Sequence, residues 1–147
     1  MPEKKTIERA RKAKREGKAP STQAGEFVRE EIEHIREGKH GAKNTKQAIA
    51  IGLSKARRSG VKLPAPKKGT TSERTRKQAK RDTAKAKAST TRKKSPKRAR
   101  AAKKALARAP RSAASTRALS RQARQAAPRR RKRTAGSSRS RTKRAAA

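Results

Sequence analysis

The sequence contains no cysteine, tryptophan or tyrosine, and it has a single phenylalanine among 147 residues. Without cysteine, neither a disulfide framework nor a thiolate metal site can form. The two histidines, His34 and His40, would need carboxylate ligands to hold a metal, so the sequence alone predicts no metal site and no cofactor. The chain also lacks the aromatic platforms on which sequence-specific RNA binding normally depends.

Acidic residues and long hydrophobic runs are equally scarce. There are 48 lysines and arginines against 10 acidic residues, which gives a formal net charge of +38. No run approaches the ~20 apolar residues of a membrane span, and the N-terminus lacks a secretory signal, so we expect a cytoplasmic protein without membrane insertion. Such a chain repels itself until anions neutralise it, which makes a polyanion the expected partner.

Nothing in the sequence favours an enzyme. Acid–base groups do occur close together at Glu33, His34, Glu37 and His40, but neighbours such as His34 with Glu30 or Glu37 are commonplace on a solvated helix. There is no nucleophile motif, no phosphate-cradling glycine loop and no dinucleotide fingerprint. We therefore predict no catalytic and no cofactor-binding residues.

Charge divides the chain near Pro64-Ala-Pro66. The first 66 residues hold 17 basic and eight acidic side chains, whereas residues 67–147 hold 31 basic and two acidic ones. Nearly all large apolar residues also precede this point, and without them a chain cannot offset its ordering entropy. The predicted fold class is mostly α, with a helical hairpin or three-helix N-terminal segment and a long disordered basic tail. The expected parts are a basic helical extension at 1–20, a helix-loop-helix domain at 21–63 and a low-complexity cationic tail at 64–147.

Three N-terminal helices are predicted. The first spans residues 4–16, the second runs from Ser21 or Thr22 to Gly38, and the third runs from Asn44 or Thr45 to Gly60. The second helix has an apolar stripe at helical spacing, which consists of Ala24, Phe27, Val28, Ile32 and Ile35. Its solvated side is expected to carry Glu26, Glu30, Glu33 and Glu37.

The third helix should begin with a capping box and pack closely on the second. Asn44 and Gln47 have the spacing of a capping box, and Gly52 lies on the inner stripe, where it permits close approach of two helices. Its outward side offers Lys46, Gln47, Ser54, Lys55, Arg57 and Arg58. A helix-turn-helix reader with residues 45–58 as recognition helix is an alternative, although this set lacks a convincing group of base-reading side chains.

The tail carries the main candidate binding residues. Its alanine-rich blocks 97–109 and 112–127 have the propensity to become helical once phosphates neutralise them. The candidate nucleic-acid-binding residues are Lys67, Lys68, Arg92, Lys93, Lys94, Ser95, Pro96, Lys97, Arg98, Arg100, Lys103, Lys104, Arg129, Arg130, Arg131, Lys132, Arg133, Arg139, Arg141, Lys143 and Arg144. Secondary phosphate contacts are assigned to Lys39, Lys43, Lys46, Lys55, Arg57 and Arg58.

Two resemblances bear on function. The block GEFVREEIEHIREGKHGAKNTKQAIAIGLSKARRSGVKLP (25–64) resembles a domain of short, basic, uncharacterised bacterial proteins with Lys/Arg/Ala-rich tails. The tail is similar in composition to linker-histone H1 tails, and Ser95-Pro96-Lys97-Arg98 resembles their Ser-Pro-Lys-Lys turns, which implies minor-groove contact. Regular Ala-Lys-Pro repeats are absent.

Charge and resemblance together predict a bacterial nucleoid-associated, histone H1-like protein that binds duplex DNA without sequence specificity and compacts or bridges it. RNA is kept as an alternative partner, in a ribosome-associated assembly factor. A further alternative is an adaptor in which residues 21–63 dock a protein or self-associate while the tail tethers them to DNA.

Overall fold

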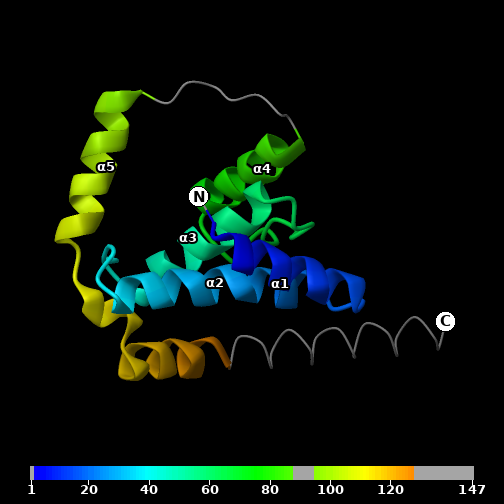
Figure 1. The fold of residues 1–147 in the computed structure, drawn as a ribbon, viewed down its shortest axis with the longest axis horizontal. Coiled ribbons are helices and arrows are strands. Elements are labelled where there is room, and N and C mark those ends of the chain that lie inside the picture. The colour runs from blue at the N-terminus through cyan, green and yellow to red at the C-terminus, as the bar shows by residue number, and fades with distance from the viewer. Residues whose placement is uncertain (1, 88–94, 128–147) are drawn as a thin grey trace.

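The computed structural model describes residues 2–87 and 95–127, and within them every regular element is a helix (Figure 1). The mostly α fold class is therefore confirmed. The elements are α1 (Lys4–Arg15), α2 (Pro20–Arg36), α3 (Thr45–Arg58), α4 (Glu73–Lys87), α5 (Pro96–Arg108) and the 3-10 helix η1 (Arg111–Ala114). Residues 116–127 are also helical.

The predicted ends of α2 and α3 are confirmed. Gly38 and Gly60 adopt φ values of 80° and 89°, in the left-handed region that glycine occupies without steric cost. After α2, Lys39 N donates to His34 O at 3.0 Å and Gly38 N donates to Ile35 O at 3.2 Å, which is the Schellman pattern. Glycine therefore ends both helices and reverses the direction of the chain after each of them.

The start of α2 differs from the sequence prediction. The second helix begins at Pro20 and not at Ser21 or Thr22, because proline is well suited to the first helical position and no side-chain cap is used. At α3 the capping residues behave as predicted, with Asn44 Oδ1 accepting from Gln47 N at 2.8 Å. The Gln47 side chain reaches one residue further back than in a standard capping box and accepts from Lys43 N.

Helix α2 lies between α1 and α3 and organises two apolar clusters (Figure 1). The first cluster contains Ala10, Ala24, Phe27, Ala56 and Val61, with Ile7, Leu53 and Leu63 packed against it. The second contains Ile35, Ala42, Ala48, Ala113 and Ala114, with Ile32 at its edge. The predicted stripe of α2 thus supplies both clusters, and alanine rather than large side chains makes up most of the core.

Gly52 sets the distance between α2 and α3. A methyl group at this position would lie 2.6 Å from Val28 Cα and 3.0 Å from Phe27 O, closer than van der Waals contact allows. The close approach that the sequence predicted is confirmed. It also explains how small side chains fill a core with only one aromatic ring.

The prediction that Glu30 lies on the solvated side of α2 is wrong. Glu30 is 4% exposed and its neighbour Glu31 is 1% exposed. Lys55 of α3 lies 3.3 Å from Glu30 Oε1 and 2.6 Å from Glu31 Oε2, and Glu3 N donates to Glu30 Oε2. These partners from α3 and from the start of the chain could not be read from the periodicity of α2 alone. Glu33 and Glu37 are exposed, as expected.

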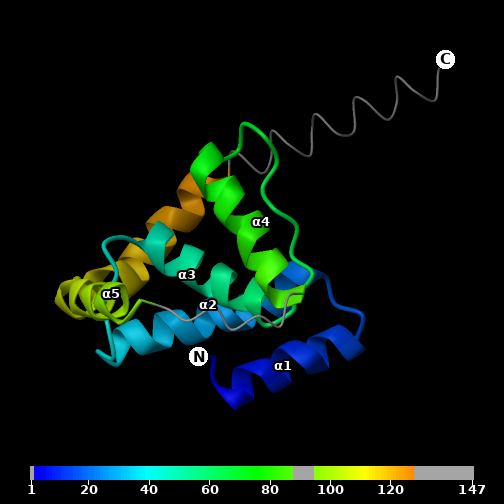
Figure 2. The ribbon, with the colours of Figure 1, turned by 90° about the horizontal axis from the view of Figure 1, so that it is seen from above.

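Packed structure also continues past Pro66, where the sequence predicted a disordered tail. Helix α4 lies against α3 (Figure 2), and its Asp82 is only 1% exposed. Asp82 accepts hydrogen bonds from Ser54 Oγ at 2.7 Å, Arg58 Nε at 3.0 Å and Gln78 Nε2 at 3.1 Å. A buried carboxylate with three donors, rather than a set of large apolar residues, therefore docks this helix.

Helix α5 packs on none of α1–α4 and stands to one side of the bundle (Figure 1). The chain is anchored where α5 ends: Gly41 N donates to Leu106 O at 2.8 Å, and Ala42 N donates to Pro110 O at 3.1 Å. Thr45 Oγ1 then donates to Ala113 O at 2.7 Å, which fixes η1 on the start of α3. The α2–α3 loop thus serves as the attachment point of this part of the chain.

Candidate nucleic-acid interface

Helix α4 has two chemically different faces. One face carries Ala79 and Asp82, which are buried against α3. The opposite face carries four exposed basic side chains at spacings of three, four and four residues, namely Arg74, Lys77, Arg81 and Lys85. Residues at these spacings line up along one side of a helix, so docking on α3 turns a row of positive charge toward solvent.

Helix α5 repeats the same pattern. Lys97, Arg100, Lys104 and Arg108 have identical spacing and are all exposed, and α5 buries none of its residues. The row spans about 16 Å at 1.5 Å per residue. The predicted contacts Ser95, Pro96, Arg98 and Lys103 are also exposed, as are Lys67 and Lys68 in the segment before α4.

The helix at 116–127 provides a third, shorter row formed by Arg117, Arg121 and Arg124, all exposed. Arg121 also lines a hollow of about 370 Å³ that includes Lys43 and Lys46 at the start of α3. The structure thus brings two of the secondary candidates next to an arginine more than 70 residues away. Positive side chains from separate elements at the N-terminal end of α3 favour an anion at this place.

The other secondary candidates are engaged within the protein. Lys39 lies 2.9 Å from Glu37 Oε2, Lys55 pairs with Glu30 and Glu31, and Arg58 pairs with Asp82. Arg57 is buried, its pKa is lowered by desolvation, and its Nη2 donates to Pro64 O at 3.4 Å. Lys55 and Arg57 are largely covered by these contacts, whereas Lys39 and Arg58 remain about half exposed and can still reach a phosphate.

The helix-turn-helix alternative is not supported. Residues 45–58 do form α3, but α4 packs on the outward side that would have to enter a DNA groove. Ser54 and Arg58 contact Asp82, and Gln47 caps its own helix. A recognition helix needs a free face with several base-reading side chains, and α3 lacks one.

Part of the predicted interface lies outside the described residues. This applies to the two runs Arg92, Lys93, Lys94 and Arg129, Arg130, Arg131, Lys132, Arg133, and to Arg139, Arg141, Lys143 and Arg144. Conversely, the prediction omitted the rows on α4 and on 116–127. Their helical spacing was present in the sequence and would have identified them. What the sequence did not show is that Asp82 is buried, which leaves Glu73 as the only exposed acidic residue of α4.

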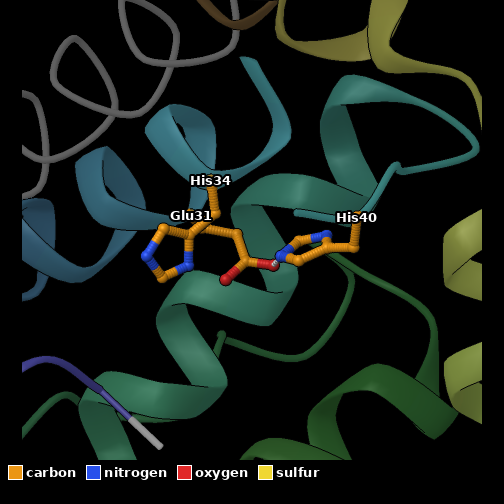
Figure 3. Close-up of side chains that lie close together, drawn as sticks. All are labelled: Glu31, His34 and His40. Carbon is orange, nitrogen blue, oxygen red and sulfur yellow. Dashed lines mark ion pairs between the residues drawn. The ribbon is translucent and has the colours of Figure 1, made fainter. Parts of the chain in front are cut away.

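The histidines do not form the neighbour pairs expected along α2. His34 Nε2 donates to Glu3 Oε1 at 2.8 Å, so its partner lies before α1 and is neither Glu30 nor Glu37. This hydrogen bond holds the pKa of Glu3 below its ordinary value. His40 Nε2 lies 3.2 Å from Glu31 Oε1 (Figure 3).

Fold and surface together define an all-helical protein, over its described residues, whose helices beyond the first three display rows of lysine and arginine. Among those residues no helix is long and apolar enough to cross a membrane.

Comparison with known proteins places the first three helices in context. Residues 3–68 match the sequence profile of DUF6496, a family of unknown function. The match includes α1–α3 and ends before α4. No curated protein and no solved structure matches the chain.

Proposed function

We propose that this protein binds duplex DNA through its phosphate backbone and compacts or bridges it, as a bacterial nucleoid-associated, linker-histone-like protein. The observation that carries the proposal is the repeated row of exposed basic side chains on α4, α5 and 116–127. None of these rows contains an acidic residue, because Asp82 is buried and Glu73 lies outside the row on α4.

Such rows are unfavourable for an isolated protein. Like charges three or four residues apart on a helix each cost about 0.2–0.5 kcal/mol, and the net charge of +38 adds long-range repulsion. A polyanion removes both costs and releases its own condensed counterions. The charge pattern is therefore explained by a bound polyanion and has no structural purpose without one.

The rows suit phosphates better than bases. The 16 Å row on α5 spans about five base pairs of duplex at 3.4 Å per pair. Lysine and arginine at helical spacing contact phosphates without reading sequence, which requires polar side chains directed at base edges. A chain with one phenylalanine also offers few stacking surfaces for single-stranded RNA. These considerations favour duplex DNA and non-specific binding.

The separation of the rows favours bridging. Helices α4 and α5 are separate elements on different sides of the molecule (Figure 2). Helix α4 is docked on α3, whereas α5 does not pack on α3, so the two rows do not share one surface. One molecule can then contact two neighbouring duplexes.

The test is a gel-shift titration of the full-length protein on random-sequence duplex at increasing salt. Neutralising the row on α5 by changing Lys97, Arg100, Lys104 and Arg108 to alanine should reduce the slope of log affinity against log salt by up to ~3.6, at ~0.9 per phosphate contact. The fold should not change, because the four substituted side chains are exposed and α5 buries none of its residues.

The matched control removes the same charge from α1, at the exposed residues Lys4, Lys5, Lys12 and Lys14. It should leave the slope nearly unchanged. Equal slopes for both variants would show that total charge, and not the rows, determines binding. Structured RNA that outcompetes duplex DNA at matched salt would overturn the choice of partner.

A further inference from the structure

Two histidines and a buried carboxylate converge where α2 meets the α2–α3 loop (Figure 3). One ligand atom from each of Glu31, His34 and His40 lies within 4.8 Å of the others. Glu31 is 1% exposed, and the side chains of His34 and His40 are 14% and 21% exposed. The two rings stand nearly perpendicular, with centroids 6.2 Å apart.

Each histidine has one ring nitrogen already occupied by an acceptor. His34 Nε2 donates to Glu3 Oε1 at 2.8 Å, and His40 Nδ1 donates to Gly41 O at 3.2 Å. Histidines that bind metals characteristically donate their second N–H to a carboxylate or carbonyl, which fixes ring orientation and tautomer. The rings of His34 and His40 both make such a second hydrogen bond in the structure.

The remaining nitrogens then face the carboxylate as acceptors. With a proton on Nδ1, neutral His40 directs the lone pair of Nε2 at Glu31 Oε1 across 3.2 Å. His34 likewise keeps Nδ1, on the side of its ring turned toward Glu31 in Figure 3. Two acceptors cannot hydrogen-bond each other, so either a proton on Nε2 or a bound metal ion must lie between His40 and Glu31.

The distances fit a transition-metal ion. With bonds of ~2.0–2.1 Å to nitrogen and oxygen, neighbouring ligands of a tetrahedral zinc ion lie about 3.3–3.4 Å apart. The separation of 3.2 Å between His40 and Glu31 is close to this value. The ligand atom of His34 lies within 4.8 Å of the other two, so the three side chains would have to draw closer together when the ion binds.

The surrounding charges leave one oxygen of Glu31 committed elsewhere. Lys55 Nζ lies 2.6 Å from Glu31 Oε2 as an ion pair, although without hydrogen-bond geometry. Glu31 would therefore coordinate through a single oxygen. Glu30 and Glu3 provide further negative charge nearby and offset Lys55.

We propose that Glu31, His34 and His40 form a binding site for a divalent transition-metal ion of the zinc class, with water as the fourth ligand. Two imidazoles and one carboxylate favour Zn²⁺ over Mg²⁺, which prefers oxygen ligands in octahedral geometry. The ion would fasten the α2–α3 loop to α2, and Glu3 would tie the start of the chain to the same site. Since Gly41 and Ala42 of this loop hold the chain after α5, the metal would stabilise the attachment of the basic part.

The experiment is calorimetric titration of Zn²⁺ into the full-length, nucleic-acid-free protein. We expect about one tightly bound Zn²⁺ per chain and no comparable binding of Mg²⁺. His40→Ala should abolish tight binding, and Glu3→Gln, which removes only an outer partner of His34, should weaken it by ~10–100-fold. The matched control Glu37→Gln changes an exposed carboxylate of the same helix end and should bind like the parent.

Absence of saturable Zn²⁺ binding by the parent protein, or equal binding by His40→Ala, would overturn the proposal. If His40→Ala loses helicity without metal, the Co²⁺ spectrum of the unaltered chain decides the question. Intense d–d bands of tetrahedral cobalt would support the site, and weak octahedral bands would contradict it. None of these readouts involves DNA, so they are independent of the proposed function.

Discussion

The helical body formed by α1–α3 and the basic segment at residues 67–147 are held together in different ways. The body is stabilised by close packing of alanine, a few larger apolar side chains and Gly52. In the basic segment, α4 docks through Asp82 and α5 packs on none of α1–α4. The profile match to DUF6496 ends at residue 68, between α3 of the body and α4 of the basic segment.

This difference separates two tasks along one chain. Acidic residues are concentrated in the body, where Glu30 and Glu31 are buried against Lys55 and where Glu3 pairs with His34. In the basic segment the two acidic residues are Glu73 and Asp82, so nearly all of its charge remains available to a partner. In the proposed function, the body would be the anchor and the basic segment would be the binding surface.

The largest expected effect comes from removing the carboxylate that joins the two regions. Asp82→Ala leaves Ser54, Arg58 and Gln78 without their shared acceptor. We expect a loss of about 2 kcal/mol, less than for a fully buried ion pair because the side chain of Arg58 is half exposed. Hydrogen exchange should show faster exchange for the amides of α4, while α2 keeps its protection.

The matched control is Glu73→Ala, which removes the other acidic residue of the same helix. Glu73 is exposed and pairs with Arg76 three residues away on the same helix, so its removal should leave the docking of α4 intact. If both variants released α4 equally, net charge and not the Asp82 contact would hold α4 on the body.

A smaller effect is expected within the body at Gly52. Gly52→Ala places a methyl group 2.6 Å from Val28 Cα, so the backbones of α2 and α3 must separate. Overpacking of this kind typically costs 1–3 kcal/mol, and we expect about 2 kcal/mol in urea denaturation followed by circular dichroism.

Gly25→Ala is the control, because a methyl group at this exposed position of α2 meets nothing within 4 Å. It should stabilise the body by about 0.5–1 kcal/mol through helix propensity alone. A destabilising Gly25→Ala, or a neutral Gly52→Ala, would contradict the account of close helix approach.

The sequence predicted the body better than the contacts between regions. The apolar stripe of α2, Gly38, Gly60 and the Asn44 cap are local signals, and the structure confirms all of them. Burial of Glu30 and docking of α4 by Asp82 depend on partners 25 to 28 residues away, and no periodicity within one helix reveals such partners. The basic rows could be predicted in part. Their helical spacing can be read from the sequence, but the exposure of the row on α4 depends on the docking of Asp82.

The cluster of Glu31, His34 and His40 shows the same limit more sharply. The sequence showed two histidines without evident carboxylate ligands, and the nearest acidic neighbours along α2 pointed to Glu30 and Glu37. Folding instead turns Glu31 inward and brings Glu3 to His34 from the start of the chain. Only tertiary structure could assemble these groups.

The smallest expected effect concerns an exposed ion pair of the body, at the turn after α1. Glu16 Oε2 lies 2.7 Å from Lys18 Nζ, and the hydrogen bond and charge of Lys18 lower the pKa of Glu16 below its ordinary value of 4.5. A carboxylate with a lowered pKa stabilises the fold above its unfolded pKa, and this contribution is lost as pH falls through the folded value. Glu16→Gln should therefore lower the thermal midpoint slightly at neutral pH and not at all in strong acid. A difference that grows as the solution is acidified would contradict this sign, and a large difference at neutral pH would mean that surface charge, rather than close packing, stabilises the body.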